Sequence, residues 1–311
     1  MLENINMVNN LLEVLYIISG IIILVCGIYA YKNKENKKRI GSALFWIILG
    51  FIFIFGKVIP SFVVGILLIV LALLTATKNV SLQSLKPVSD AYKEEKEKLF
   101  KNLLFIPAIS IGLIAFLVAQ FTKLGGLIGL GIGAMSSLIL CMIITKEKAS
   151  TVPYESSRML QQMGPSVILP QLLASLGGLF AEAGVGEIVA NIMKGVIPAD
   201  NKLFGVIGYC VSMAVFTIVM GNAFAAFAVI TAGIGIPFVI GLGGDPNIVS
   251  ALGLTAGFCG TLMTPMAANF NMIPASILEM ENKNGVILEQ IPVALILLVI
   301  NTTIMYLFAF R

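Results

Sequence analysis

Histidine is absent from the chain of 311 residues, and charged residues make up only 12% of it. Histidine is the most common general base and the most common metal ligand, so its absence removes the usual route to acid–base or metal chemistry. Soluble domains carry about 25% charged residues. Half that share, with 58% hydrophobic residues and a mean hydropathy of +1.00, places most of the chain in lipid. The charges lie in short stretches between apolar runs, which is typical of membrane-protein loops and not of a nucleic-acid-binding surface.

The four cysteines, Cys26, Cys141, Cys210 and Cys259, each stand alone inside an apolar run. No two have the spacing of metal ligands, so we interpret them as small core residues and expect no metal site. Membrane enzymes normally need a base, a metal or paired carboxylates at depth, and no Asp or Glu lies near the centre of any predicted span. We therefore expect the chain not to be an enzyme.

Long apolar runs dominate what is present, and a spanning helix needs roughly 20 apolar residues. The runs predict an all-α, polytopic integral membrane protein with about eight spans, one re-entrant hairpin and one broken helix. The predicted spans cover 11–31, 42–56, 60–77, 101–122, 124–145 and 163–180, followed by a hairpin over 203–242, a broken helix over 247–280 and a last span over 287–310. We divide the chain into a three-span N-terminal scaffold, 1–80, a charged cytoplasmic linker, 81–100, and a third part, 101–311.

Basic residues in the loops determine the expected orientation, because cytoplasmic loops carry an excess of Lys and Arg. The loop 32–39 holds five basic residues and one acid, and is expected inside, as are the linker and the basic stretch 146–158. The N-terminus, which lacks the positive region of a cleavable signal peptide, is then outside. Glu182, Glu187 and Asp245 also fall outside, and only the C-terminal Arg311 disagrees with this orientation.

The dipeptide Gly221-Asn222 interrupts the apolar stretch 203–242. It joins either two complete spans or the two arms of a re-entrant hairpin, and loop charge does not distinguish them because the parity of crossings is the same. Backbone that leaves the helix at membrane depth has to be buried in protein or to line a watery cavity. Asn222 would supply both donors and an acceptor there. An ordinary turn capped by Asn222 is the alternative.

A second interruption lies at Thr264-Pro265, where proline removes a backbone donor and clashes with the preceding turn. Four polar side chains accompany it: Thr261, Thr264, Asn269 and Asn271. A lone proline often gives only a kink, but two amides and two hydroxyls beside it favour an unwound stretch between two half-helices. Such a break frees carbonyls that can hold a cation and aims half-helix N-termini at an anionic substrate.

The stretches 221–233, 243–246 and 261–271, together with 41–56, resemble a bacterial membrane-protein family of formerly unknown function. That family is identified as one subunit of a pyroglutamate (oxoproline) transporter and is paired with a second small membrane-protein family. The resemblance covers nearly the whole chain. It implies a multi-pass protein of the bacterial cytoplasmic membrane that works with a second membrane subunit.

A more distant likeness is to the ion transporter superfamily of arsenite, citrate and dicarboxylate carriers, which have two inverted repeats. From residue 101 onward this chain is similar to one such repeat, with three spans, a hairpin, a broken helix and a final span. The likeness implies that a partner supplies the other repeat. The chain departs from the pattern at Gly221 and Ala223, where those carriers have hydroxyl residues, and at Met266, where a second proline is expected.

These features predict a subunit of a secondary transporter for a small organic acid, with pyroglutamate implied by the resemblance alone. Asn222, Thr264, Asn269 and Asn271 are expected to bind substrate, and Gly221, Thr261 and Thr264 to bind a cation, with Pro265 making the break. Because no titratable group is predicted at depth, we expect sodium as the coupling ion, or coupling by the partner, and no other cofactor. The expected partners are the substrate, membrane lipid and a second membrane subunit, and not nucleic acid. A homodimer and a non-transporting scaffold or accessory subunit are the alternatives.

Overall fold

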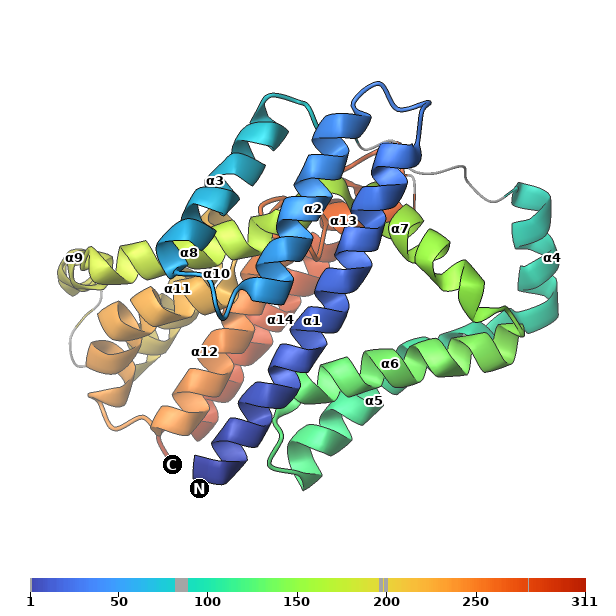
Figure 1. Ribbon diagram of the computed structural model, residues 1–311. Helices are drawn as coiled ribbons and strands as arrows, with labels where there is room; N and C mark the ends of the chain where they lie inside the picture. Colours follow the sequence, from blue (N-terminus) through green and yellow to red (C-terminus); the bar gives the residue numbers. More distant parts are fainter. Residues whose placement is uncertain (1, 82–88, 196–197, 199–200, 279) are drawn as a thin grey trace. The chain divides into compact units, whose positions relative to one another are not determined.

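The computed structural model describes residues 2–81, 89–195, 198, 201–278 and 280–311 of the chain. It is 81% helical, and the described residues contain no strand (Figure 1). The predicted all-α class is therefore confirmed. Most of the first half of the predicted linker, 82–88, and residue 279 of the predicted broken helix lie outside the described residues.

Within the described residues, six helices are long and apolar enough to cross a membrane. They are Asn6–Lys32, Ala91–Phe121, Gly126–Thr145, Lys202–Met220, Ala223–Ile240 and Gly285–Phe308, and the shorter Arg39–Phe55 and Ser61–Ala76 are also apolar. A helix satisfies all of its backbone groups internally, which is what lipid requires of a spanning segment. The chain is thus a polytopic membrane protein, while the expected number of about eight spans stays a prediction.

The chain divides into two compact units, Met1–Gly164 and Pro165–Arg311. This division differs from our predicted boundary near residue 100, because two of the spans that we assigned to the third part belong to the first unit. The helices of the first unit are α1 (Leu2–Lys32), α2 (Arg39–Phe55), α3 (Ser61–Ala76), α4 (Asp90–Phe100), α5 (Phe105–Phe121), α6 (Gly126–Thr145) and α7 (Val152–Met163), with 3-10 turns at Lys101–Leu104 and Ala149–Thr151. A third 3-10 turn, Gly164–Ile168, joins the two units.

Helix pairs organise the first unit, with α2 and α7 packed on α1 and α5 packed along α6 (Figure 1). Glycines bring the pairs close together. A Cβ on Gly20 of α1 would lie 2.9 Å from the carbonyl oxygen of Gly50 on α2, so neither position has room for a larger residue. The rings of Tyr29 and Tyr154 meet edge to face between α1 and α7, at 5.9 Å between centroids.

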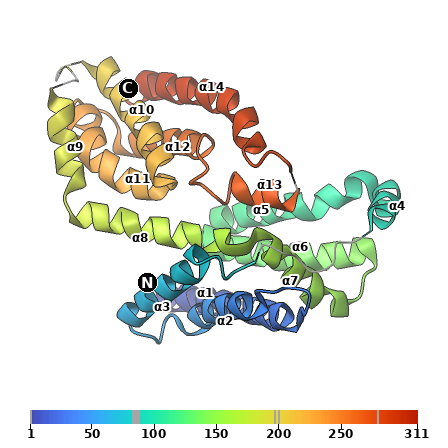
Figure 2. The ribbon, with the colours of Figure 1, turned by 90° about the horizontal axis from the view of Figure 1, so that it is seen from above.

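The second unit contains α8 (Leu169–Glu182), α9 (Val185–Lys194), α10 (Lys202–Met220), α11 (Ala223–Ile230), a π-helix (η4, Thr231–Ile240), α12 (Pro246–Thr261), α13 (Met272–Ile277) and α14 (Gly285–Phe308). Helices α10, α11, α12 and α14 lie beside one another in this unit (Figure 2). Their buried side chains form its core, which includes Val206, Tyr209, Met213, Ile230 and Met305. The predicted span 163–180 is occupied by the 3-10 turn Gly164–Ile168 and by α8, whose 14 residues cover about 21 Å, and it stays a prediction.

Candidate functional site

The turn between α10 and α11 occurs where the sequence placed it. Helix α10 ends at Met220 and is followed by Gly221, whose φ of +68° is a left-handed conformation that favours glycine. The backbone then extends at Asn222, whose side-chain oxygen accepts hydrogen bonds from the N–H groups of Phe224 (2.9 Å) and Ala225 (3.2 Å). Asn222 is therefore the N-cap of α11. Gly221 and Asn222 form the hairpin tip.

The break predicted at Thr264-Pro265 is also present. Helix α12 ends at Thr261, and regular helix resumes only at Met272. Residues 262–271 between these ends are called the break here. Its backbone is held by the side-chain nitrogen of Asn271, which donates to the carbonyl oxygens of Thr261 (2.8 Å) and Thr264 (2.6 Å). One buried amide thus replaces the backbone donors that a continuing helix would have supplied.

A side-chain hydrogen bond joins the break to the hairpin. The hydroxyl of Thr264 donates to the carbonyl oxygen of Ile218, near the end of α10, at 2.8 Å. Beside it, a Cβ added to Gly221 would lie 2.7 Å from backbone atoms of Met266. The hairpin tip and the break are therefore in direct contact, so a shift of one has to move the other.

Both features lie deep along α14. At one end of this helix, the backbone N–H of Asp245, just before α12, donates to the carbonyl oxygen of Ala309 at 2.7 Å. From that level α12 runs for 16 residues, about 24 Å, whereas α14 runs for 24 residues, about 36 Å. The break is therefore about two thirds of the way along a helix that is long enough to cross a bilayer.

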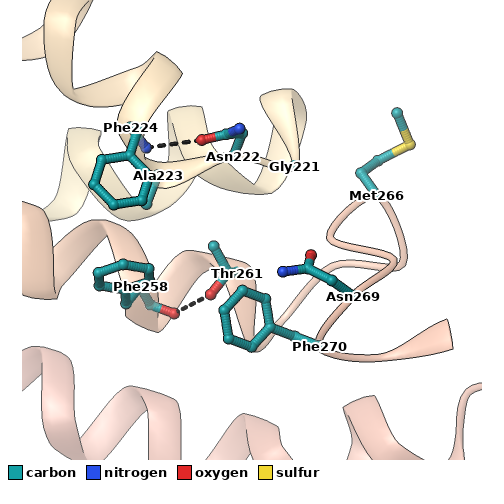
Figure 3. Close-up of a pocket in the computed structure, with 9 residues that line it drawn as sticks. All are labelled: Gly221, Asn222, Ala223, Phe224, Phe258, Thr261, Met266, Asn269 and Phe270. Atoms are coloured by element: carbon teal, nitrogen blue, oxygen red, sulfur yellow. Dashed lines mark hydrogen bonds between the residues drawn. The ribbon is translucent and has the colours of Figure 1, made fainter. Parts of the chain in front are cut away.

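Beside this contact, a cavity of about 250 Å³ is lined by residues of the hairpin tip and of the break (Figure 3). Its polar lining comes from Asn222 on one side and from Thr261 and Asn269 on the other. The remaining lining residues are Gly221, Ala223, Phe224, Phe258, Met266 and Phe270. No charged side chain is among the nine, so the cavity is a neutral site with amide and hydroxyl groups.

The residues predicted for the site divide into two sets. Gly221, Asn222, Thr261 and Asn269 line the cavity together. Thr264 and Asn271 are buried behind it, with 2% and 0% of their surface exposed, and their side chains hold the backbone of the break. Pro265 is exposed within the break. The binding roles of the other six residues stay predictions.

Three phenylalanines that were not predicted from the sequence also line the cavity. The ring of Phe258 meets those of Phe224 and Phe270, with centroid distances of 5.7 and 6.3 Å. They form a continuous apolar wall opposite the amides. A sequence signal was present, because Phe270 follows Asn269 directly and Phe224 stands two residues after Asn222. A large apolar residue beside each interrupting polar residue indicates a two-sided pocket.

Thr217 is a further residue that the sequence did not single out. It lies one turn before the hairpin tip, fully buried, and its hydroxyl oxygen has no hydrogen-bond partner among the described residues. It faces α12, where a Cβ on Gly257 would lie 3.4 Å from that oxygen. The side-chain oxygen of Asn271 is also buried and without a partner in the described part of the chain. These two oxygens are therefore buried acceptors whose bonding capacity is unused, although neither residue lines the cavity.

The described residues contain no group of three His, Cys, Asp or Glu side chains that could hold a metal ion. A cation at this site would have to be bound by neutral oxygens, from carbonyl groups, hydroxyls and amides. These are the ligands of hard cations and not of zinc or copper.

The chain belongs to a family described as proteins of unknown function, DUF979, whose model matches residues 13–310. The match includes the hairpin tip, the break and every residue that lines the cavity. No curated protein and no solved structure matches the chain.

Proposed function

We propose that this DUF979 chain is a subunit of a secondary transporter for a small organic acid and is not an enzyme. The observation that carries the proposal is the cavity between the hairpin tip and the break. Interrupted helices near the bilayer midplane are the elements with which secondary transporters bind substrates and ions. Irregular backbone at that depth is tolerated where it lines a cavity or is buried in protein.

Attraction of an anion to this cavity would come from dipoles. Helix α11 starts at Ala223, directly after its N-cap Asn222, so its N-terminus, with its partial positive charge, lies at the cavity. The side-chain N–H groups of Asn222 and Asn269 can also donate hydrogen bonds to a carboxylate. A volume of about 250 Å³ suits a small solute. Pyroglutamate, which the family resemblance suggests, is the substrate that we propose to test first.

For the coupling ion we propose sodium, held by the oxygens near the hairpin tip and the break. The unpartnered oxygens of Thr217 and Asn271 support this, because a buried acceptor without a donor is costly unless something binds it. The hydroxyl of Thr261 donates to the carbonyl oxygen of Phe258 and keeps its lone pairs for a cation. The hydroxyl of Thr264 donates to Ile218 and accepts the N–H of Met266 at 3.2 Å, so it keeps one lone pair.

We further propose that 203–242 is a re-entrant hairpin within an arrangement of about eight spans. Both ends of this stretch lie at the same end of α14, because the ammonium group of Lys202 lies 4.6 Å from the Phe310 ring and Asp245 bonds to Ala309. Two complete spans would give the same arrangement, so the proposal rests on the tip, which bonds through Ile218 to Thr264 of the break, partway along α14. In this proposal the transport-type repeat, 101–311, is completed by a second membrane subunit, or by a second copy of the chain. The membrane is the bacterial cytoplasmic membrane, with the N-terminus outside.

The test is uptake of labelled pyroglutamate by cells that express this chain alone or together with its partner subunit, with and without sodium. Uptake that needs both chains and sodium would support the proposal. Uptake by this chain alone would favour the homodimer. No uptake in any condition, with both proteins shown in the membrane, would remove the substrate assignment.

A non-transporting scaffold is the second candidate, favoured by the plain apolar sequences of α2 and α3. The two functions differ in how they respond to changes at the cavity. A scaffold would tolerate substitution of Asn222 and Asn269, whereas a transporter would lose uptake.

A further inference from the structure

The turn between α1 and α2 concentrates positive charge. Lys32 ends α1, Arg39 begins α2, and Lys34, Lys37 and Lys38 lie between them. The four lysines are exposed to solvent, and Glu35 is the only acid in 32–39. We call residues 32–39 the basic turn. It follows the end of a membrane-spanning helix directly, so it lies where a bilayer presents its headgroups.

The start of α2 adds to this charge instead of balancing it. A helix N-terminus carries a partial positive charge, which proteins usually offset with an acidic residue or a capping side chain. Helix α2 has neither, because its N-cap Lys38 makes no side-chain capping bond and its first turn contains no acid. Arg39 is held at the same place by the ring of Tyr31, at 5.7 Å. The first turn of α2 therefore offers an anion both a helix N-terminus and a cationic side chain.

Asn36 provides a second, independent observation at the start of α2. Only 2% of its surface is exposed, and its side-chain oxygen accepts the N–H of Lys38 at 2.9 Å. Its backbone oxygen accepts the N–H of Arg39 at 3.1 Å, so the residue is fixed against the start of α2. Its side-chain nitrogen has no acceptor among the described residues. A buried donor without a partner in the described part of the chain therefore lies in the turn that leads into α2, and this turn also carries five cationic residues.

We propose that the basic turn binds a phosphate group, and that its source is the headgroup of an anionic phospholipid such as phosphatidylglycerol. Helix N-termini and Lys or Arg side chains are the usual ligands of phosphate. Anionic headgroups attract basic segments next to a spanning helix, by roughly five-fold in association for each positive charge. This inference does not depend on the transport function, since it concerns a different part of the chain.

Trp46 gives a direct readout, because it is the only tryptophan and lies seven residues after Arg39, about 10 Å along α2. The full chain would be placed in phosphatidylcholine nanodiscs that contain a small share of nitroxide-headgroup phosphatidylglycerol or, in parallel, of the matching phosphatidylcholine. We expect stronger quenching of Trp46 by the labelled phosphatidylglycerol. The double variant Lys37→Gln/Lys38→Gln should lower this preference by about five-fold for each charge removed.

The control variant is Lys57→Gln/Lys123→Gln, which removes the same charge from exposed positions outside the basic turn and should keep the preference. Asn36→Asp is the sharper variant, because it keeps the acceptor for Lys38 and adds an internal anion at the start of α2. It should abolish the preference while circular dichroism stays unchanged. An equal preference in wild type, Asn36→Asp and the double variant would overturn the proposal. If inorganic phosphate changes Trp46 emission in phosphatidylcholine nanodiscs while phosphatidylglycerol has no advantage, the lipid source is wrong.

Discussion

At the scale of single residues, Asn222 has two tasks that substitution can separate. Its oxygen caps α11, and the residue also lines the cavity (Figure 3). Loss of the cap costs about 1 kcal/mol of stability. Loss of a substrate contact would instead appear in uptake. To separate the two tasks, a control residue has to cap a helix without lining the cavity. Asn201, which caps α10 in the same way, is such a residue.

We expect Asn222→Ala and Asn269→Ala to abolish uptake while the protein still inserts in the membrane. Asn201→Ala should lower the thermal stability of the detergent-purified protein about as much as Asn222→Ala does, with uptake retained. Asn222→Asp keeps an oxygen for the cap but adds a negative charge, so it should keep stability and lose uptake of an anion. Normal uptake by both alanine variants would refute the site.

Gly221 is expected not to tolerate substitution by a larger residue, for two reasons. Its backbone is left-handed, and it is in contact with the break. Gly184 has nearly the same φ, +69° against +68°, but a Cβ there would meet nothing within 4 Å. Gly184→Ala should therefore cost only the backbone strain, about 1 kcal/mol. Gly221→Ala should cost at least about twice as much, because its Cβ would lie 2.7 Å from backbone atoms of Met266. Thermal unfolding in detergent tests this, and equal losses would mean that the tip and the break are not in contact.

At the scale of elements, the break shows how a sequence signal becomes structure. The ring of a proline clashes with the carbonyl of the residue four positions earlier. For Pro265 that residue is Thr261, which is where α12 ends. The freed carbonyl of Thr261 accepts a hydrogen bond from Asn271. The interruption was predictable because it follows from local chemistry.

Other parts of these elements could not be predicted from the sequence. No periodicity applies inside the break, so nothing indicated that Asn269 would line the cavity while Asn271 is buried behind it. The π-helix, Thr231–Ile240, has the same apolar composition as an α-helix. Its setting depends on residues distant in sequence, such as Tyr209, whose hydroxyl lies 2.7 Å from that of Thr231 and whose ring lies against Gly235.

The hydrogen bond between Thr264 and Ile218 is expected to couple the break to the hairpin. Thr264→Val keeps the shape of the side chain and removes the donor to Ile218 together with the acceptor of the Met266 N–H, so it should cost at least about 1 kcal/mol of stability. Thr303→Val is the matched control, since its hydroxyl bonds only within its own helix at an exposed position. We expect thermal unfolding to shift for Thr264→Val and to change little for Thr303→Val. Equal shifts would indicate that this bond does not join the two elements.

At the scale of the whole molecule, hydropathy located the long apolar helices well, because the need to satisfy the backbone in lipid leaves few other structures. It did not predict the division at Gly164, which depends on which helices pack together. The predicted repeat, 101–311, extends over both compact units, since α5 and α6 belong to the first. Whether a partner subunit completes this repeat is therefore tested by measuring uptake in cells that express both chains.

The identity of the coupling ion, sodium or proton, is also a property of the whole molecule, because coupling needs a group that binds and releases the ion during transport. None of the nine residues that line the cavity titrates near neutral pH, whereas neutral oxygens are present at the tip and the break. We therefore expect uptake to follow an imposed sodium gradient and to vary little between about pH 6 and pH 8 at constant sodium. Vesicles with both subunits, loaded to impose one gradient at a time, test this. Uptake driven by a proton gradient without sodium would place the coupling group elsewhere, either on the partner or on a carboxylate of this chain outside the cavity.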